Sequence, residues 1–214
     1  MKYQGSGLAK MNEDNKEFII ISGTPGTGKS SIGKILSEEI NCKYIEVSEF
    51  AIKKGLVVPD ETGRNTYVIK EEELKEEILK ESNGLTILIT HYPDVFLDDD
   101  RFYFNTAFVL LLRTNPLILM KRLENKGWNH KKISENVLAE AFNTIAEDIY
   151  DYNDMIIEID TTNIKPEDSL GIIFDKITSL DFGIKINWLI DESLVNFISS
   201  LVDRINLNYN GVGD

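Results

Sequence analysis

The sequence predicts an α/β fold built on a parallel sheet, and three observations indicate it. Short apolar runs of the type buried in parallel sheets recur along the chain, helix-like patterns separate most of them, and a glycine-rich turn follows the first. The predicted strands are residues 18–21, 42–48, 85–90, 107–113 and 155–160. We therefore expect a central five-stranded parallel sheet flanked by helices.

Apolar residues at spacings of three and four predict the helices between these strands. The segment 71–82 places Leu74, Ile78 and Leu79 on one face and ends at Asn83 and Gly84. The other predicted helices are 30–40, a long helix over 131–151, a helix over 166–180 that begins at Pro166, and an amphipathic helix over 191–205.

The chain length of 214 residues fits one well-buried α/β core better than two independent domains. Residues 1–16 are polar and lack periodicity, so we expect a loose extension there. The main domain should cover 17–180. The apolar segment 181–214 should form a helical extension packed on the core, although contact with a partner is an alternative.

Composition excludes several classes of protein. The formal net charge of −13 has the wrong sign for broad attraction to nucleic acid. The longest apolar run, 107–112, is far too short to span a bilayer, and no apolar signal core begins the chain. We expect a cytoplasmic monomer, also nuclear if the source is eukaryotic. The single cysteine, Cys42, is expected to be a small buried residue in a strand.

The segment Gly23 to Ser30 reads GTPGTGKS, a complete phosphate-binding loop (P-loop) between a predicted strand and a predicted helix. Its glycines let backbone N–H groups turn inward around phosphate oxygens, and the helix adds the positive end of its dipole. Lys29 should reach the β and γ phosphates, and the Ser30 hydroxyl should bind Mg²⁺. We expect ATP to be bound by Gly23, Thr24, Gly26, Thr27, Gly28, Lys29, Ser30 and Ser31.

The loop fits both nucleotide-driven switches and small kinases, and three later segments favour a kinase. Residues 47–74 form a long polar insertion after the second predicted strand, where a kinase would hold its acceptor. Residues 110–142 join two helices across a very short basic turn. The sequence DTTN at 160–163 ends the last predicted strand, at the carboxyl edge where open α/β sheets bind ligands.

Several motifs together resemble the adenylate kinase family that assists small ribosomal subunit assembly, the coilin-interacting nuclear ATPase type of archaea and eukaryotes. They are GTPGTGKS, KYIEVSEF, THYPD, LLRTNP and KRLENKGWNHKKISENVLAEAF, spread over residues 17–162. The resemblance implies the reaction of ATP and AMP to two ADP with Mg²⁺, slow ATP hydrolysis, and a small-subunit ribosomal protein as partner in ribosomal RNA maturation. It also implies an AMP-side segment at 46–69 and a small lid at 125–135.

The resemblance also assigns site residues. Lys126 stands where the family commonly has an arginine of the lid, and it keeps the charge but loses the bidentate fork. His91 and Asp94 match residues thought to orient water or metal near the γ phosphate. Many relatives have an aspartate two residues before this histidine, whereas this chain has Ile89. Glu49 is the candidate on the AMP side.

Chemistry adds two arginines to the candidate site. Phosphoryl transfer needs positive charge on the equatorial oxygens, which makes Arg113, at the end of a predicted buried strand, the best catalytic candidate. A salt bridge is the alternative role for Arg113. Arg64 is a second candidate on the AMP side. For Glu49 and Arg64 a solvated surface charge is an equal alternative, and a structural role is an equal alternative for His91.

Two competing functions stay open from the sequence. One is an assembly factor whose nucleotide site mainly switches its grip on a ribosomal protein, with little kinase turnover. The other is a small-molecule kinase that acts on a sugar or a shikimate-like acceptor. On the helix before the lid, at most one of Lys121 and Arg122 is expected to face the site, and His130 is expected on the lid surface.

Overall fold

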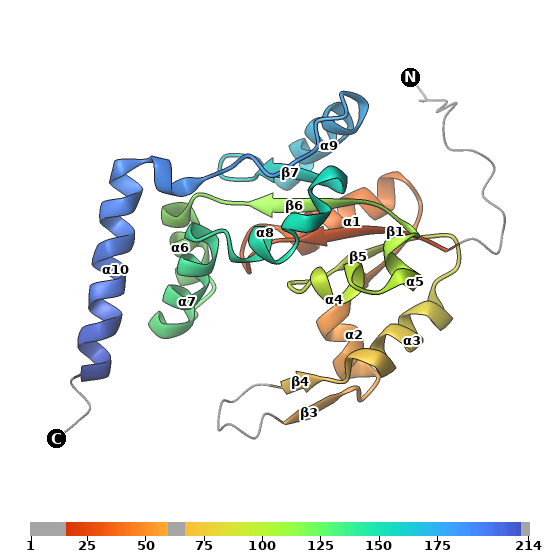
Figure 1. Ribbon diagram of the computed structural model, residues 1–214, viewed down its shortest axis with the longest axis horizontal. Coiled ribbons are helices and arrows are strands. Elements are labelled where there is room, and N and C mark those ends of the chain that lie inside the picture. The colour runs from red at the N-terminus through yellow and green to blue at the C-terminus, as the bar shows by residue number, and fades with distance from the viewer. Residues whose placement is uncertain (1–15, 60–66, 211–214) are drawn as a thin grey trace.

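A computed structural model of the chain describes residues 16–59 and 67–210, with side chains described to residue 205. The predicted five-stranded parallel sheet is confirmed, with strand order β2-β5-β1-β6-β7 (Figure 1). Its strands are β1 (Glu17–Ser22), β2 (Lys43–Glu46), β5 (Leu85–Ile89), β6 (Thr106–Arg113) and β7 (Ile156–Asp160). The predicted extension 1–16 lies outside the described residues except for Lys16.

Helices cover both faces of the sheet because its strands are apolar on both sides. On one face, a core that includes Phe18, Ile20 and Leu88 packs against α2 (Val47–Lys53), α3 (Glu71–Glu81), α4 (Asp94–Leu97), α5 (Asp100–Tyr103) and α8 (Thr144–Asp148). On the other face, Ile19, Ile21 and Leu110 pack with α1 (Lys29–Glu39) and α9 (Ser169–Thr178). No helix in the described ranges is long and apolar enough to cross a bilayer.

The polar insertion after β2 contains regular structure. It begins with α2 and continues into a two-stranded antiparallel hairpin of β3 (Val57–Pro59) and β4 (Tyr67–Ile69), which leads into α3. Residues 60–66 between the two strands lie outside the described part of the chain. The hairpin and α2 lie together below the sheet in Figure 1.

The helix predicted over 131–151 is wrong, because the chain divides there into α7 (His130–Ala141), α8 and a 3₁₀ turn (Tyr150–Met155). Asn143 takes the left-handed conformation, with φ 57°, and ends the first helix. Its side chain accepts a hydrogen bond from Arg113, which stabilises the break. Phe142, which follows α7, is 49% exposed.

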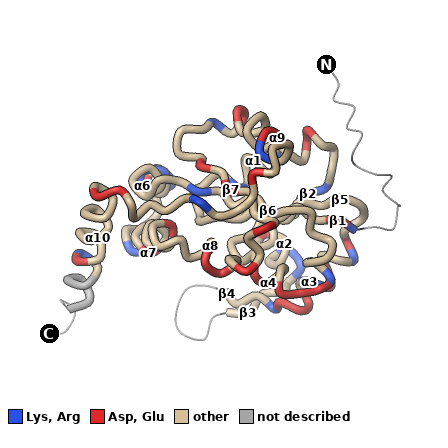
Figure 2. The backbone as a smooth tube through the Cα atoms, turned by 45° about the horizontal axis from the view of Figure 1, so that its top comes forward, with Lys and Arg blue, Asp and Glu red and all other residues tan. Residues whose placement is uncertain are grey.

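One smaller expectation also changes. Cys42 precedes β2 and is half-buried, and burial raises the pKa of its thiol. Asp99, the residue before α5, accepts the Arg101 backbone N–H at the start of that helix and pairs with the Arg101 guanidinium. These hydrogen bonds hold the pKa of Asp99 well below its usual range. Other acidic residues gather along α3 (Figure 2).

The described C-terminal residues contact the sheet first and then the helices α6 (Pro116–Asn125) and α7. Gly183 forms a bridge with Ile157 of β7, and a 3₁₀ turn (Trp188–Ile190) leads into α10 (Glu192–Asn210). Ile198 and Leu201 of α10 share an apolar cluster with α6 and α7. The described part of the segment 181–214 therefore packs on the core.

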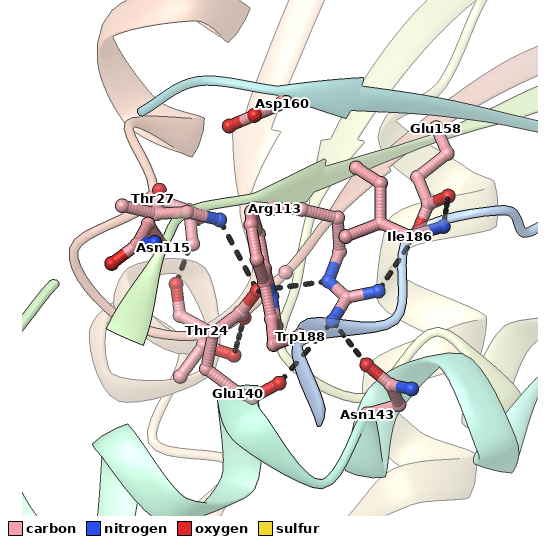
Figure 3. A network of polar contacts seen from close by, with 12 residues as sticks. Thr24, Thr27, Arg113, Asn115, Glu140, Asn143, Glu158, Asp160, Ile186 and Trp188 are labelled. Carbon is pink, nitrogen blue, oxygen red and sulfur yellow. Dashed lines mark hydrogen bonds and ion pairs between the residues drawn. The ribbon is translucent and has the colours of Figure 1, made fainter. Parts of the chain in front are cut away.

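A buried polar network joins these parts (Figure 3). Arg113, at the end of β6, pairs with Glu140 of α7 at 2.8 Å and with Glu158 of β7 at 2.7 Å. Glu140 also accepts hydrogen bonds from the Thr24 hydroxyl at 2.6 Å and from the Trp188 indole N–H at 3.0 Å. One carboxylate thus connects the P-loop, the sheet, the lid helix and the C-terminal segment.

The other carboxylate completes the network on the far side of Arg113. Glu158 accepts the backbone N–H groups of Lys185 and Ile186 at 2.6 and 2.7 Å. The Trp188 ring lies 5.9 Å from the Arg113 guanidinium carbon, within cation–π range. Arg113, Glu140 and Glu158 are all at most 4% exposed, so water hardly solvates their charges and the three side chains must stabilise one another.

We expect Arg113→Met to destabilise the protein by about 3–5 kcal/mol, because it leaves two carboxylates buried without their cation. Urea denaturation followed by circular dichroism measures this free energy of unfolding. Arg101→Met is the control, since Arg101 also binds several carboxylates but lies on the surface. Its loss of stability should be much smaller. Equal losses in the two variants would contradict the role given to the buried network.

Candidate active site

The P-loop lies at the carboxyl end of β1, in the middle of the sheet, where open α/β sheets bind ligands. Gly23 adopts φ 139° and passes so near β6 that an added Cβ would lie 2.3 Å from the Leu112 carbonyl oxygen. Gly28 takes a left-handed conformation, and no described side chain caps α1. The first N–H groups of α1 are therefore available to an anion.

Lys29 folds back over the loop and satisfies its carbonyls. Its ammonium donates to the Gly23 oxygen at 2.6 Å and to the Thr24 oxygen at 3.1 Å. Burial lowers the pKa of Lys29 to about 7, against the opposing attraction of Glu140 and Glu46. Lys29 lies beside the position expected for phosphate. Because of its low pKa, its charge can change near neutral pH.

The two threonines of the loop turn their hydroxyls into the protein. Thr24 donates to Glu140, and Thr27 donates to the Thr24 carbonyl oxygen at 2.9 Å. The Thr161 hydroxyl, at the end of β7, lies 2.9 Å from the Thr27 carbonyl oxygen. These side chains fix the loop conformation, which leaves the backbone of Thr24 and Thr27 as their means of binding phosphate.

A cavity of about 310 Å³ opens above the loop. It joins residues of the P-loop, of β2 and α2, of the end of β5, and of the turn between α6 and α7. The lining residues are Pro25, Gly26, Gly28, Lys29, Ser30, Ser31, Glu46, Ser48, Glu49, Ile89, Thr90, His91, Lys126 and Trp128. Four segments far apart in the sequence therefore meet around one phosphate-binding loop.

The donors around the loop fit Mg²⁺. Ser30 is exposed in the first turn of α1 and lines the cavity with its neighbour Ser31. Within the described ranges, no three His, Cys, Asp or Glu side chains are grouped to hold a metal. Mg²⁺ is usually held by phosphate oxygens and water with one or two protein ligands, a role that the exposed Ser30 hydroxyl fits.

His91 lines the cavity, with its Nδ1 3.2 Å from the Gly23 carbonyl oxygen. Burial and the Lys29 charge lower its pKa to about 4, so the ring is neutral at pH 7. Because a carbonyl oxygen can only accept, Nδ1 donates and Nε2 is left with a lone pair. Asp94 begins α4 and does not line this cavity. Burial, and after it the nearby charge of Asp94, raises the pKa of Asp148.

Ile89 is a core residue at the edge of the cavity. It is 4% exposed and packs on α1 at Gly33, where an added Cβ would lie 2.5 Å from Ile89 Cδ1. The close approach of helix and strand explains an apolar side chain at this position. An aspartate, which many members of the resembled family carry here, is absent from β5 of this chain.

The lid predicted over 125–135 falls on the turn between α6 and α7 and on the first residues of α7. Lys126 ends α6, is exposed and lines the cavity, whereas His130 begins α7 on the surface. Of the two basic residues before it, Lys121 is exposed and Arg122 turns toward the loop. Arg122 donates to the Gly26 oxygen at 3.3 Å and to the Thr161 oxygen at 2.7 Å.

Of the two candidates for binding AMP, the structure describes Glu49 but not Arg64. Glu49 lies in the first turn of α2 and lines the cavity. Arg64 lies in 60–66, outside the described residues.

Arg113, expected to face the ligand edge, does not line the cavity above the loop. Its side chain is 3% exposed and is used by Glu140, Glu158 and Asn143. The salt-bridge alternative left open by the sequence describes it correctly. Arg113 therefore supports the loop through Glu140 and Thr24 and does not reach the cavity.

Glu46, Glu140 and Trp128 were missed as site residues. Glu140 carried a signal, since it occupies the buried stripe of α7 three residues after Val137. A charged residue on an apolar stripe indicates a buried partner. Trp128 and Glu46 were inside recognised motifs, but only the fold shows that they line the cavity.

Solved structures share this fold at low sequence identity. Shikimate kinase from Acinetobacter baumannii has a TM-score of 0.51 at 16% identity, over 79% of this chain and 96% of that one. YorR protein from Bacillus subtilis also has a TM-score of 0.51, at 19% identity over 75% and 95% of the two chains. These similarities show that the chain has the fold of P-loop kinases.

Proteins related in sequence have a higher identity to this chain than these solved structures have. A family model described as "AAA domain" matches residues 19–143, more than half of the chain. The "Putative adenylate kinase" of Saccharolobus islandicus strain L.S.2.15 is 34% identical over 90% of this chain and 97% of its own. That of Pyrococcus furiosus is 32% identical over 78% and 86%. The chain therefore belongs to the AAA domain family and to the adenylate kinase-like family that includes these archaeal proteins.

Proposed function

We propose that the protein is an adenylate kinase that converts ATP and AMP into two ADP with Mg²⁺. The observation that carries the proposal is the shared cavity. It joins a P-loop with a buried lysine to the helix α2 on one side and to the lid turn on the other. A nucleotide hydrolase needs only the loop and a water site, whereas a kinase also needs a place for the second substrate.

On the donor side, the loop and the start of α1 bind the ATP phosphates through backbone N–H groups. Lys29 exchanges its two carbonyl contacts for phosphate oxygens. Ser30 would hold Mg²⁺, which would supply positive charge to the phosphates. Ser31, exposed in the same turn, would bind the α phosphate.

On the acceptor side, Glu49 and α2 help to hold AMP, with Arg64 as a further ligand of its phosphate. An oxygen of the AMP phosphate attacks the γ phosphorus, and the bond from γ phosphorus to the bridging oxygen of ADP breaks. Lys126 of the lid approaches the transferred group with positive charge. A lysine makes one point contact where an arginine makes two, so we expect slower transfer than an arginine at this position would give.

His91 and Asp94 account for the slow ATP hydrolysis that we also propose. Neutral His91 has a free Nε2 in the cavity and can accept a hydrogen bond from a water near the γ phosphate. Asp94 is not in the cavity and can act only from beyond it, through the loop after β5.

A role in small ribosomal subunit assembly is a second proposal, and charge favours it. The chain carries a net charge of −13, which complements a basic ribosomal protein. A cavity of about 770 Å³ between α6, α7 and α10 offers apolar contacts from the half-buried residues Met120, Leu138 and Ile205. A pull-down with ribosomal proteins, with and without ATP, tests the proposal. Recovery of no such protein in either condition would exclude it.

We expect Lys29→Ala to slow ADP formation from ATP and AMP by about 100-fold or more, because the transferred phosphate loses its nearest cation. A coupled assay of ADP formation measures the rate. Lys34→Ala, which changes an exposed lysine of the same helix, is the control and should keep the wild-type rate. Parallel assays with shikimate or a sugar in place of AMP separate the kinase classes. Equal rates in wild type and Lys29→Ala would refute the proposal.

Nucleotide affinity should fall as the pH rises above 7. Free Lys29 has a pKa of about 7, and phosphate needs its charged form, so binding takes up a proton at higher pH. We expect the Kd for ADP, measured by calorimetry in EDTA, to be about tenfold weaker near pH 8.5 than near pH 7. Lys29→Arg should abolish this change, because a guanidinium stays charged. The same slope in both proteins would place the titrating group elsewhere.

A further inference from the structure

Glu46 is the last residue of β2 and lies directly beside Ile89 of the neighbouring strand β5. The two are paired in the parallel register, one step after the pair Ile45 and Leu88. Residues paired in this way point to the same face of the sheet. The carboxylate of Glu46 on β2 therefore lies directly beside position 89 of β5, where this chain has isoleucine and no carboxylate.

The face to which Glu46 points is the face of the P-loop helix. Ile45 belongs to the core on the α2 side, and side chains alternate along a strand, so Glu46 points to the opposite side. Ile89 is in the core that contains α1. Ser30 lies in the first turn of α1, and Glu46, Ser30 and Lys29 line the same cavity.

The Glu46 carboxylate has no structural use among the described residues. It is half-buried and forms no hydrogen bond or ion pair within 16–59 and 67–205, although it lies near enough to Lys29 to stabilise its charge. A half-buried anion beside a phosphate site repels the ligand unless a cation lies between them. Glu140 differs from Glu46, because its carboxylate accepts hydrogen bonds from Thr24, Arg113 and Trp188.

We propose that Glu46, together with Ser30, holds the Mg²⁺ of the nucleotide, and so replaces the carboxylate that Ile89 cannot provide. The inference rests on the proposed binding of ATP at this loop. One carboxylate, one hydroxyl, two phosphate oxygens and water form a set of hard oxygen ligands that Mg²⁺ accepts. The alternative is that Glu46 only balances the charge of Lys29.

Calorimetry of ADP binding in Mg²⁺ and in EDTA separates the two roles. We expect the wild type to bind ADP more tightly in Mg²⁺ than in EDTA. In Glu46→Gln this increase in affinity should be smaller by about tenfold or more. In EDTA the variant should bind ADP as well as the wild type or better, because a negative charge is gone. Electron paramagnetic resonance with Mn²⁺ and ADP should show the same loss of metal bound with protein.

Glu39→Gln is the matched control, since it removes the same charge at the exposed far end of α1 and should keep the full effect of Mg²⁺. Glu46→Asp keeps the charge with a shorter reach and should lose part of the gain. Thermal melting without ligand checks that each variant is folded.

The inference is overturned if Glu46→Gln keeps the gain from Mg²⁺, or if it weakens ADP binding equally in Mg²⁺ and in EDTA. The second result would show that Glu46 only balances the charge of Lys29. A wild type that binds no ADP would exclude both this inference and the proposed kinase. A wild type that shows the metal gain, lost in Glu46→Gln, but forms no ADP from ATP and AMP would exclude the kinase alone.

Discussion

The structure depends on one buried cation. Arg113 leaves the end of β6 and pairs with carboxylates 27 and 45 residues further along the chain, and each of these binds other segments. Glu140 carries the contact to the P-loop and to Trp188, and Glu158 carries the contact to the C-terminal backbone. Because a buried ion pair is tolerated only when every charge is satisfied, the loop, the lid helix and the C-terminal segment are held together as a unit.

That unit gives the phosphate loop its shape before a ligand arrives. Thr24 is fixed by Glu140, Thr27 by the Thr24 carbonyl, and Lys29 by two loop carbonyls. The hydrogen bonds of Lys29 are the only ones among these three that a phosphate can replace without disturbing the backbone. The loop therefore combines a rigid frame with one exchangeable charge, which is the arrangement that electrostatic catalysis of phosphoryl transfer needs.

The sequence was sufficient for the sheet and the loop, since both depend on local patterns. The five apolar runs became the five strands, and GTPGTGKS formed the loop between β1 and α1. It was insufficient where distant residues decide. Arg113 and Arg122 are both arginines beside apolar segments, and only the buried Glu140 and Glu158 determine that Arg113 turns inward. The break at Asn143 likewise depends on Arg113, so periodicity predicted one helix too long.

The charge of the whole chain bears on the proposed role of Mg²⁺ at this site. A protein with a net charge of −13 repels free nucleotide at long range, and Glu46 and Glu49 add two negative charges to the cavity itself. Lys29 and Lys126 offset these charges, but one of the two lysines has a pKa near neutrality. Backbone N–H groups at the start of α1 and the proposed Mg²⁺ would supply the rest of the attraction. The metal complex of ATP, the substrate that we propose, carries less negative charge than ATP alone, so the acidic surface disfavours it less than the free nucleotide.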